Sequence, residues 1–462
     1  MSRPAAMSGF PEFLPAQRTV ELEVVDALTR TFELHGFASI ETRAVEPLEQ
    51  LLSKGETSKE VYVLRRLQAD AEGQGGSDAG IGLHFDLTVP FARYVVENAG
   101  RLEFPFRRYQ VQKVWRGERP QEGRYREFTQ ADIDIVGRDT LAFHHDVEVA
   151  RVMAEAMAAL PVPRLTLQVN NRRLIQGFYA GLGASDLDAV MRVIDKLDKL
   201  PGETVEKMLV EDAGLTPDQA ALCLRLASIR TTDTSFVEQV RALGVESELL
   251  DQGLAELAAV IEGCASVSGD RVRVVADLRI ARGLDYYTGT VFETLMEGYE
   301  GLGSICSGGR YDALATDGRA TYPGVGISLG LSRMLVPLLA AGGMTASRSV
   351  PSAVLVALVD EESRAQSDDV ANRLRARGIP TEVAAAPQKF GKQIRTAERR
   401  GIPFVWFPGD PADTEGRAHQ VKDIRSGDQV DADPDTWTPP TEDLRPQVVV
   451  PPSSTTPNKE QQ

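Results

Sequence analysis

The chain has 462 residues, of which 42% are hydrophobic and 26% charged, so it can bury a core and is long enough for two or three domains. No apolar run approaches the length that crosses a bilayer, and the N-terminus lacks a signal-peptide core, so we expect a cytoplasmic protein without membrane contact. The formal net charge of −16 argues against nonspecific polyanion binding, although a local basic surface can still contact nucleic acid.

Cysteine and histidine spacing argues against two kinds of site. Cys223, Cys264 and Cys306 lie far apart with no CxxC pair, so neither a disulfide framework nor a zinc site is expected. The histidines form no HExxH motif, and the adjacent His144 and His145 are expected to point apart on a helix. No metal-ligand set is therefore predicted.

The N-terminal stretch predicts a helix, a short strand and a second helix. Apolar residues recur at helical spacing over Thr19–His35 and a glycine follows, while Phe37–Thr42 has the composition of a strand. A further strand leads into a helix that we expect to begin at Pro90. Asp86 and Thr88 precede that helix, where they either cap it or bind a ligand.

A charged hairpin over Trp115–Gly137 is the most informative stretch of the N-terminal half. A polar loop of turn residues connects two strands, and the second strand alternates over Tyr125–Val136. One strand face carries an amide and two carboxylates, and two arginines flank it: Gln130, Asp132, Asp134, Arg116 and Arg124. Cations beside carboxylates indicate a pocket for a substrate with phosphate and amine groups; the alternative is a solvated hairpin with salt bridges.

From about residue 171 to 265 the pattern changes to successive helices. Before this region, a helix is expected over Asp139–Leu160 and a strand over Leu165–Asn170. Within it, apolar periodicity predicts helices over Thr216–Arg230 and Ser235–Ile261. We therefore expect a helical insertion with a solvated, charged face.

Three stretches after the insertion combine glycine with polar or aromatic residues. A strand over Val272–Leu278 precedes the string RGLDYYTG at 282–289, in which a glycine permits a tight bend. The string CSGGRYD follows at 306–312, and Gly324–Pro337 begins glycine-rich and becomes a helix that carries Arg333. Simple packing also explains these stretches, so their residues alone leave the chemistry open.

Alternating strands and helices from about residue 351 predict a small α/β domain. Strands are expected over Ala353–Val359 and Phe404–Phe407, and helices over Glu362–Arg377 and Phe390–Arg400. Basic residues outnumber the single acid between positions 389 and 400, so this helix has either a solvated face or a phosphate-contacting one. From Asp433 the chain is rich in Pro, Thr, Ser and Gln, and we expect a disordered tail over 433–462.

These motifs resemble those of one family and occur in the same order. The N-terminal helix–strand unit resembles motif 1 of the class II aminoacyl-tRNA synthetases, the hairpin resembles motif 2, and the stretch with Arg333 resembles motif 3. RGLDYYTG and CSGGRYD resemble the two signatures of the histidyl-tRNA synthetases, and the DLT-x-P segment at Asp86 resembles their element for the amino group. The resemblance covers nearly all of residues 10–430.

The resemblance implies an α+β fold with an antiparallel sheet flanked by helices. It places the catalytic core at 1–170 and 266–345, a helical insertion at 171–265 that can close over the acceptor end of tRNA, and an anticodon-binding α/β domain at 351–432. His84 stands where the family pattern has an arginine, so no ATP-related or structural role is carried over to that position.

A set of site residues follows from the same resemblance. Arg116 and Arg282 would be catalytic, since both would contact the α-phosphate of ATP. Histidine would be bound by Asp86, Leu87, Thr88, Arg116, Gln130, Asp134, Arg282, Tyr286, Tyr287 and Tyr311. ATP would be bound by Arg116, Glu118, Arg124 and Arg333, and tRNA by Arg119 and Gln121.

The implied activity is that of a histidine–tRNA ligase, which activates L-histidine with ATP and transfers it to the 3′ end of tRNA(His). Mg²⁺ would accompany ATP as its counterion, and a homodimer would form through motif 1. One alternative is the non-catalytic regulatory subunit of ATP phosphoribosyltransferase, which lacks the C-terminal domain and typically loses site residues. Another is a synthetase for threonine, proline or glycine, against which RGLDYYTG and Asp134 count.

Overall fold

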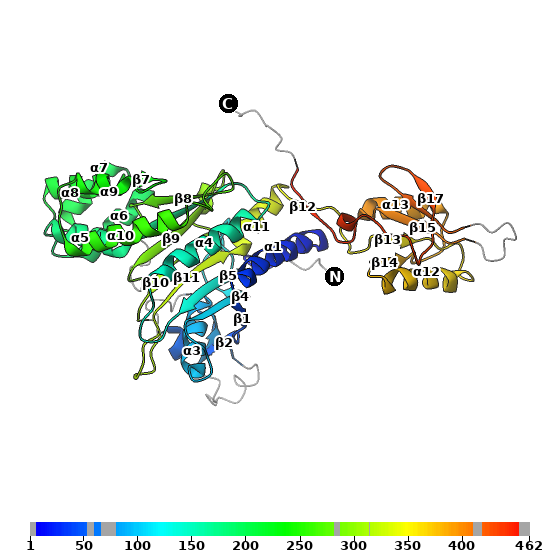
Figure 1. Ribbon diagram of the computed structural model, residues 1–462, viewed down its shortest axis with the longest axis horizontal. Coiled ribbons are helices and arrows are strands. Elements are labelled where there is room, and N and C mark those ends of the chain that lie inside the picture. Colours follow the sequence, from blue (N-terminus) through cyan, green and yellow to red (C-terminus); the bar gives the residue numbers. More distant parts are fainter. Residues whose placement is uncertain are drawn as a thin grey trace, which may run out of the picture. The chain divides into compact units, whose positions relative to one another are not determined.

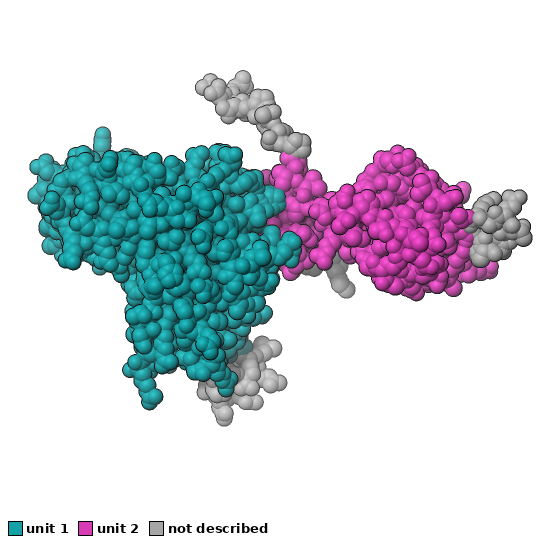
Figure 2. Space-filling model, viewed as in Figure 1, with its two compact units in different colours: residues 1–11, 25–337 teal, residues 12–24, 338–462 magenta. Residues whose placement is uncertain are grey.

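The computed structural model describes residues 6–52, 60–65, 80–280, 287–313, 315–409 and 418–451. The chain divides into two compact units, one of residues 1–11 and 25–337 and the other of residues 12–24 and 338–462 (Figure 2). Helix α1 (Pro15–Leu34) contributes residues to both units. Among the described residues, no helix is long and apolar enough to cross a membrane.

A mixed sheet of nine described strands forms the core of the first unit (Figure 1). Its order is β1-β4-β5-β11-β10-β9-β6-β8-β7, with neighbours antiparallel except for the parallel pairs β1–β4 and β6–β8. In sheet order, the bounds are Ala38–Ser39, Phe106–Trp115, Glu127–Val136, Gly324–Gly330, Cys306–Tyr311, Thr290–Met296, Leu165–Asn171, Val272–Asp277 and Arg230–Thr231. The antiparallel sheet predicted for the core is confirmed.

Helices and a small strand pair complete this core. Helix α4 (His144–Ala158) packs across β5, β11, β6 and β8, because its inward positions are small or apolar, among them Val149 and Met153. The remaining elements are β2 (Val45–Pro47), α2 (Leu48–Leu51), β3 (Ile81–Leu83), α3 (Thr88–Asn98) and α11 (Leu331–Ala340). Strand β2 pairs with β3 outside the main sheet.

The insertion contains six described α-helices: α5 (Arg172–Gly181), α6 (Leu187–Ile194), α7 (Gly202–Glu211), α8 (Pro217–Ala227), α9 (Phe236–Arg241) and α10 (Glu248–Gly263). The single helix expected over Ser235–Ile261 is wrong. The chain turns at Gly244, where φ is +75°, and the Ser247 side chain accepts the Leu250 N–H to cap a new helix. The insertion also adds a strand to the core sheet, since β7 pairs with β8.

Three N-terminal boundaries differ from expectation. The strand predicted over Phe37–Thr42 shortens to the two residues that pair with β4. Helix α3 begins at Thr88 rather than Pro90, because Asp86 Oδ1 accepts the Val89 N–H at 3.0 Å. Helix α4 begins after Asp139, which adopts a positive φ of 61° that a helix does not allow.

The second unit contains a five-stranded described sheet of order β14-β13-β15-β16-β17. Its strands are Thr381–Val383, Val354–Val356, Phe404–Phe407, Gln420–Asp423 and Gln429–Asp431 in sheet order, and its helices are α12 (Arg364–Ala376) and α13 (Phe390–Arg400). Alternate residues of β15 serve two cores: Phe404 and Trp406 pack with residues of α12, whereas Val405 packs with residues of α13. The predicted α/β domain therefore forms around both faces of this sheet.

The disordered tail expected from Asp433 is wrong for residues 433–451. Trp437 packs edge-on against Phe404 and Trp406, with ring centroids 5.2 and 5.6 Å away. Further along, β18 (Val448–Val449) pairs with β12 (Thr345–Ala346). One aromatic anchor and a short strand order this segment despite its polar, proline-rich composition.

Candidate active site

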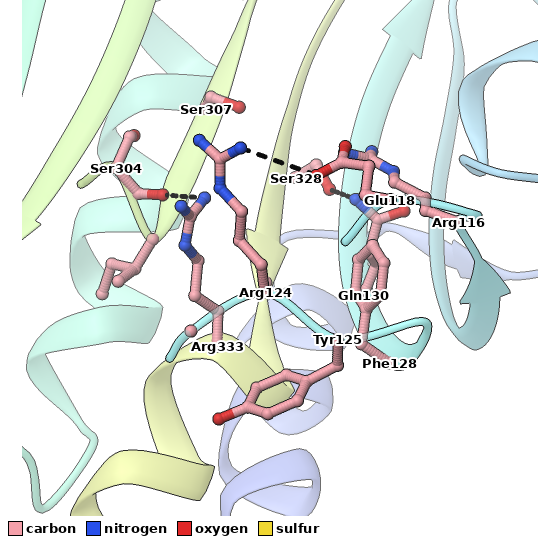
Figure 3. Close-up of a pocket in the computed structure, with 13 residues that line it drawn as sticks. Arg116, Glu118, Arg124, Tyr125, Phe128, Gln130, Ser304, Ser307, Ser328 and Arg333 are labelled. Atoms are coloured by element: carbon pink, nitrogen blue, oxygen red, sulfur yellow. Dashed lines mark hydrogen bonds and ion pairs between the residues drawn. The ribbon is translucent and has the colours of Figure 1, made fainter. Parts of the chain in front are cut away.

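A cavity of about 210 Å³ lies beside the loop between β4 and β5 (Figure 3). We call it the arginine cavity, because three arginines line it: Arg116 directly after β4, Arg124 before β5 and Arg333 in α11. The other lining residues are Glu118, Gly123, Tyr125, Phe128, Gln130, Ser304, Ile305, Ser307, Ser328 and Gly330. Among the described lining residues Glu118 is the one carboxylate, so the cavity suits an anion.

Each arginine is held by a neighbour that orients it. Arg116 Nε donates to the Phe85 carbonyl at 3.0 Å, and its guanidinium lies 5.2 Å from the centroid of the Phe128 ring. Arg124 Nη1 lies 3.6 Å from Glu118 Oε2. Arg333 Nη1 donates to the Ser304 carbonyl at 2.8 Å, and its guanidinium lies next to that of Arg124 (Figure 3).

A second, smaller pocket shares Ser307 and Ser328 with the arginine cavity. We call it the acidic pocket; it is lined by Thr88, Asp132, Asp134, Tyr287, Ser307, Gly308, Tyr311, Gly326, Ile327 and Ser328. The Tyr311 hydroxyl donates to Asp134 Oδ1 at 2.8 Å, and Arg108 Nη2 lies 2.6 Å from Asp134 Oδ2. Burial, with the Asp134 charge beside it, raises the pKa of Tyr311 well above its usual value, so the phenol remains a donor.

Strand register explains the space in the acidic pocket. Asp134 stands opposite Arg108 on β4 and opposite Gly326 on β11. A Cβ atom at Gly326 would lie 2.0 Å from Asp134 Oδ1, and one at Gly324 would lie 2.4 Å from the Tyr311 ring. Glycine on β11 therefore leaves room for both side chains.

The structure gathers most of the predicted site residues into these two cavities. Arg116, Glu118, Arg124, Gln130 and Arg333 line the arginine cavity, and Thr88, Asp134, Tyr287 and Tyr311 line the acidic pocket. Arg282 and Tyr286 lie outside the described residues.

The remaining predicted residues line neither cavity. Asp86 Oδ1 accepts the Val89 N–H at the start of α3, and Leu87 is fully buried beside it. Gln121 lines a separate cavity of about 590 Å³ that Arg124, Ser304 and Arg333 also border, and Arg119 is exposed. We call this the loop cavity.

Two buried residues of the site were not predicted from the sequence, and a pair of histidines lies differently from expectation. Asp132 lies on the strand face expected for it and also lines the acidic pocket, and the contact of the buried Arg108 with Asp134 depends on the β4–β5 register, which local sequence does not reveal. The rings of His144 and His145 lie 4.0 Å apart instead of pointing apart. With Glu148 they form the one three-residue group of possible metal ligands among the described residues, yet Arg107 already pairs with that carboxylate.

Comparison with known proteins decides the family. Residues 9–334 match the family described as Histidyl-tRNA synthetase, and residues 353–436 match the Anticodon binding domain. The chain belongs to the histidyl-tRNA synthetase family. Histidine–tRNA ligases of Cutibacterium acnes and Micrococcus luteus are each 60% identical to it, covering 97% of this chain and 99% of theirs.

Solved structures of the histidyl-tRNA synthetase family confirm the class II α+β fold. The enzyme from Nostoc sp. PCC 7120 superposes with a TM-score of 0.82 at 35% identity, covering 94% of this chain and 97% of that one. A Bacillus halodurans protein described as an ATP phosphoribosyltransferase regulatory subunit/histidyl-tRNA synthetase is 20% identical with a TM-score of 0.68, which shows a shared fold alone. This chain is an aminoacyl-tRNA ligase, as predicted.

Proposed function

We propose that this histidine–tRNA ligase carries out its reaction across the two adjoining cavities, with ATP in the arginine cavity and histidine in the acidic pocket. The observation that carries the proposal is the shared wall of Ser307 and Ser328. It brings a site for an anion next to a site for a substrate with donor groups. A carboxylate and a phosphate bound in this way would meet at the junction.

The first step joins the histidine carboxylate to the α-phosphorus of ATP. A new P–O bond forms while the bond to the β-phosphate oxygen breaks, giving histidyl-adenylate and pyrophosphate. The carboxylate is already a nucleophile, so the protein contributes orientation and positive charge rather than a covalent intermediate. Arg116 would contact the α-phosphate and the carboxylate, while Arg124 and Arg333 would bind the rest of ATP and Glu118 would place the adenine. The catalytic role of Arg282 stays a prediction.

Histidine recognition needs acceptors for its ammonium group and a pair of groups for its imidazole. Gln130 Nε2 donates to Ser328 Oγ at 2.9 Å, while Gln130 Oε1 is buried without a hydrogen-bond partner among the described residues, so it suits an ammonium donor. Asp86 and Thr88 would contact the same group. Asp134 with Tyr287 and Tyr311 would bind the imidazole, and a site that pairs both ring nitrogens rejects apolar amino acids.

The second step transfers the histidyl group to a terminal ribose hydroxyl of tRNA(His). Arg119 and Gln121 of the β4–β5 loop would contact the acceptor end, and the loop cavity beside Gln121 is bordered by Lys199 and Arg279. The second unit would bind the anticodon. Mg²⁺ would enter with ATP, because a single carboxylate, Glu118, cannot form a dedicated cation site in the arginine cavity.

Assembly and location complete the proposal. Helix α1 exposes Leu22 and Leu34 at 50% and 86%, which is consistent with a homodimer formed through motif 1. We expect the enzyme to act in the cytoplasm.

ATP–pyrophosphate exchange with each of the twenty amino acids tests the proposal. We expect exchange with histidine alone and a loss of about 10²–10³-fold for Arg116→Ala, since one preorganised donor to the transition state contributes that much. Arg164→Ala, which removes a half-exposed surface arginine near Glu297, is the matched control. Exchange with no amino acid would favour the regulatory-subunit alternative, and normal exchange by Arg116→Ala would remove this arginine from the site.

A further inference from the structure

Asp132 is a buried carboxylate whose charge is incompletely matched. It lines the acidic pocket, is 3% exposed, and its Oδ1 atom has no hydrogen-bond partner among the described residues. Buried polar atoms in folded proteins are nearly always paired, so an unpaired oxygen on a side chain that lines a pocket indicates a ligand that supplies the missing donor.

Ser328, which stands opposite Asp132 on β11, hydrogen-bonds its carboxylate, whereas the other polar neighbours are committed elsewhere. Gln110 stands opposite it on β4, but Gln110 Nε2 donates to Thr42 Oγ1 at 3.0 Å and to Gln112 Oε1 at 2.6 Å. Arg108 Nη2 lies 3.9 Å from Asp132 Oδ2 and only 2.6 Å from Asp134 Oδ2. Both amide hydrogens of Gln110 and the nearest guanidinium contact are therefore used by other groups.

The local charge balance is negative. Asp86 and Asp134 act on Asp132 as like charges, and among the described residues Arg108 is the cation that opposes them there. Burial, opposed by Arg108, raises the pKa of Asp132 to about 7. A bound cation would stabilise the ionised carboxylate, because attraction between opposite charges is strong where water is excluded.

We propose that Asp132 is a further substrate-binding residue, whose unpaired oxygen accepts a hydrogen bond from the α-ammonium group of histidine. This inference rests on the histidine site proposed above and adds a residue to it. Gln130, Asp132 and Asp134 follow one another at two-residue steps along one face of β5, each about 6.6–6.8 Å from the next. Asp134 is engaged by Tyr311, which leaves Asp132, the next residue on this strand face toward Gln130, for the ammonium.

Two inhibitors that differ only in the amino group test the contact. L-histidinol carries the ammonium and 3-(imidazol-4-yl)propan-1-ol lacks it, so the ratio of their inhibition constants in histidine-dependent exchange isolates that group. For Asp132→Asn we expect histidinol binding to weaken by about 10–100-fold and binding of the deaminated compound to change by less than about threefold, since a charged hydrogen bond is lost for one ligand only. Equal weakening of both compounds, or of neither, would overturn the inference.

A matched control and a separate readout keep the outcomes distinct. Glu127→Gln removes a carboxylate on the same strand that pairs with Lys113 and lines neither cavity, so its inhibitor ratio should equal that of the wild type. Histidine-dependent exchange by the wild-type chain tests the proposed function by itself. Its presence with an unchanged ratio in Asp132→Asn refutes the Asp132 contact alone, whereas its absence refutes both.

The wild-type chain offers a second measurement if the variant does not fold. The preference for histidinol should increase from pH 6.0 to 7.5, by up to about eightfold, as Asp132 ionises. Both compounds carry the imidazole, so titration of that ring cancels in the ratio. The other described ionisable groups facing Asp132 are Asp86, Arg108, Asp134, Cys306 and Tyr311. A ratio that is flat across this range contradicts the proposal.

Discussion

Gly326 shows how one small residue sets the geometry of the acidic pocket. A side chain at this position on β11 would meet Asp134 Oδ1 at 2.0 Å, well inside van der Waals contact. We expect Gly326→Ala to displace Asp134 and to raise the KM for histidine by about tenfold or more, while the KM for ATP changes little, since the arginine cavity is untouched. Pyrophosphate exchange at varied histidine and ATP measures the two constants.

Gly269→Ala is the control for this prediction. A Cβ atom there has no heavy atom within 4 Å, so both constants should stay at wild-type values. An unchanged histidine KM in Gly326→Ala would show that Asp134 does not need its observed position.

Asp132 should make the stability of the ligand-free enzyme depend on pH. Its pKa rises from 3.8 to about 7 on folding, so between these values the folded chain holds a proton that the unfolded chain has lost. The stability contributed by this group is therefore full below about pH 4 and falls as pH rises to 7. Asp132→Asn should raise the melting temperature at pH 8, by an amount equivalent to about 1–3 kcal/mol, and change it little at pH 5. A lower melting temperature at pH 8 would contradict the buried, uncompensated charge.

At the scale of elements, the segment after β17 holds the second unit together through one aromatic residue. Trp437 contacts Phe404 and Trp406, and Arg377 donates to the Trp437 and Pro434 carbonyls. Trp437→Ala should lower the free energy of unfolding by about 1–3 kcal/mol, because the side chain is only partly buried, while Trp437→Phe should retain much of it. Urea denaturation checks both variants; equal stability of all three proteins would mean that the packing is unimportant.

The basic face of α13 could contact phosphate or only solvent, and the exposure and pairing of its side chains show which residues are available to a phosphate. Lys389, Lys392, Arg395 and Arg399 are exposed, whereas Arg400 is bound to Glu382 and is therefore not available to a phosphate. Replacing Lys392 and Arg395 with Glu should weaken tRNA binding and reduce the salt dependence of its affinity by about one unit of slope per lost phosphate contact, leaving exchange intact. Arg364→Gln on α12, which removes an arginine already paired with Glu361, should leave the salt dependence unchanged.

The sequence predicted the bounds of a helix or strand correctly where residues adjacent in the chain determine those bounds. Helix α13 and strand β15 match their expected bounds, because Gly401 ends the helix at a φ of +75° and β15 is a continuous apolar run. The alternation on β5 correctly grouped Gln130, Asp132 and Asp134. Contacts between residues far apart in the sequence could not be predicted from local patterns. The contact of Arg108 with Asp134 depends on the register of β4 and β5, and the space that Gly326 leaves for Asp134 depends on the pairing of β11 with β5.

At the scale of the whole molecule, the proposed chemistry lies in one unit and the proposed anticodon contact in the other. Every described lining residue of the arginine cavity and the acidic pocket belongs to the first unit. A chain ending after Ala346 should therefore retain histidine-dependent exchange within about threefold but lose most tRNA charging, since the anticodon contacts are gone. Aminoacylation and exchange assays on the same preparation measure both, and full charging by the shortened chain would exclude the second unit as the anticodon reader.

The sheet order also constrains how the enzyme is made on the ribosome. Strand β5 lies between β4 and β11, and β11 emerges only after the entire insertion and strands β8, β9 and β10 have been translated. Until then one edge of β5 presents unpaired backbone groups, which are a template for wrong pairing between nascent chains. Until β11 is made, the carboxylates on β5 would stay hydrated and would repel the same strand of another nascent chain. The residues proposed to bind histidine would therefore also protect the unfinished core from aggregation.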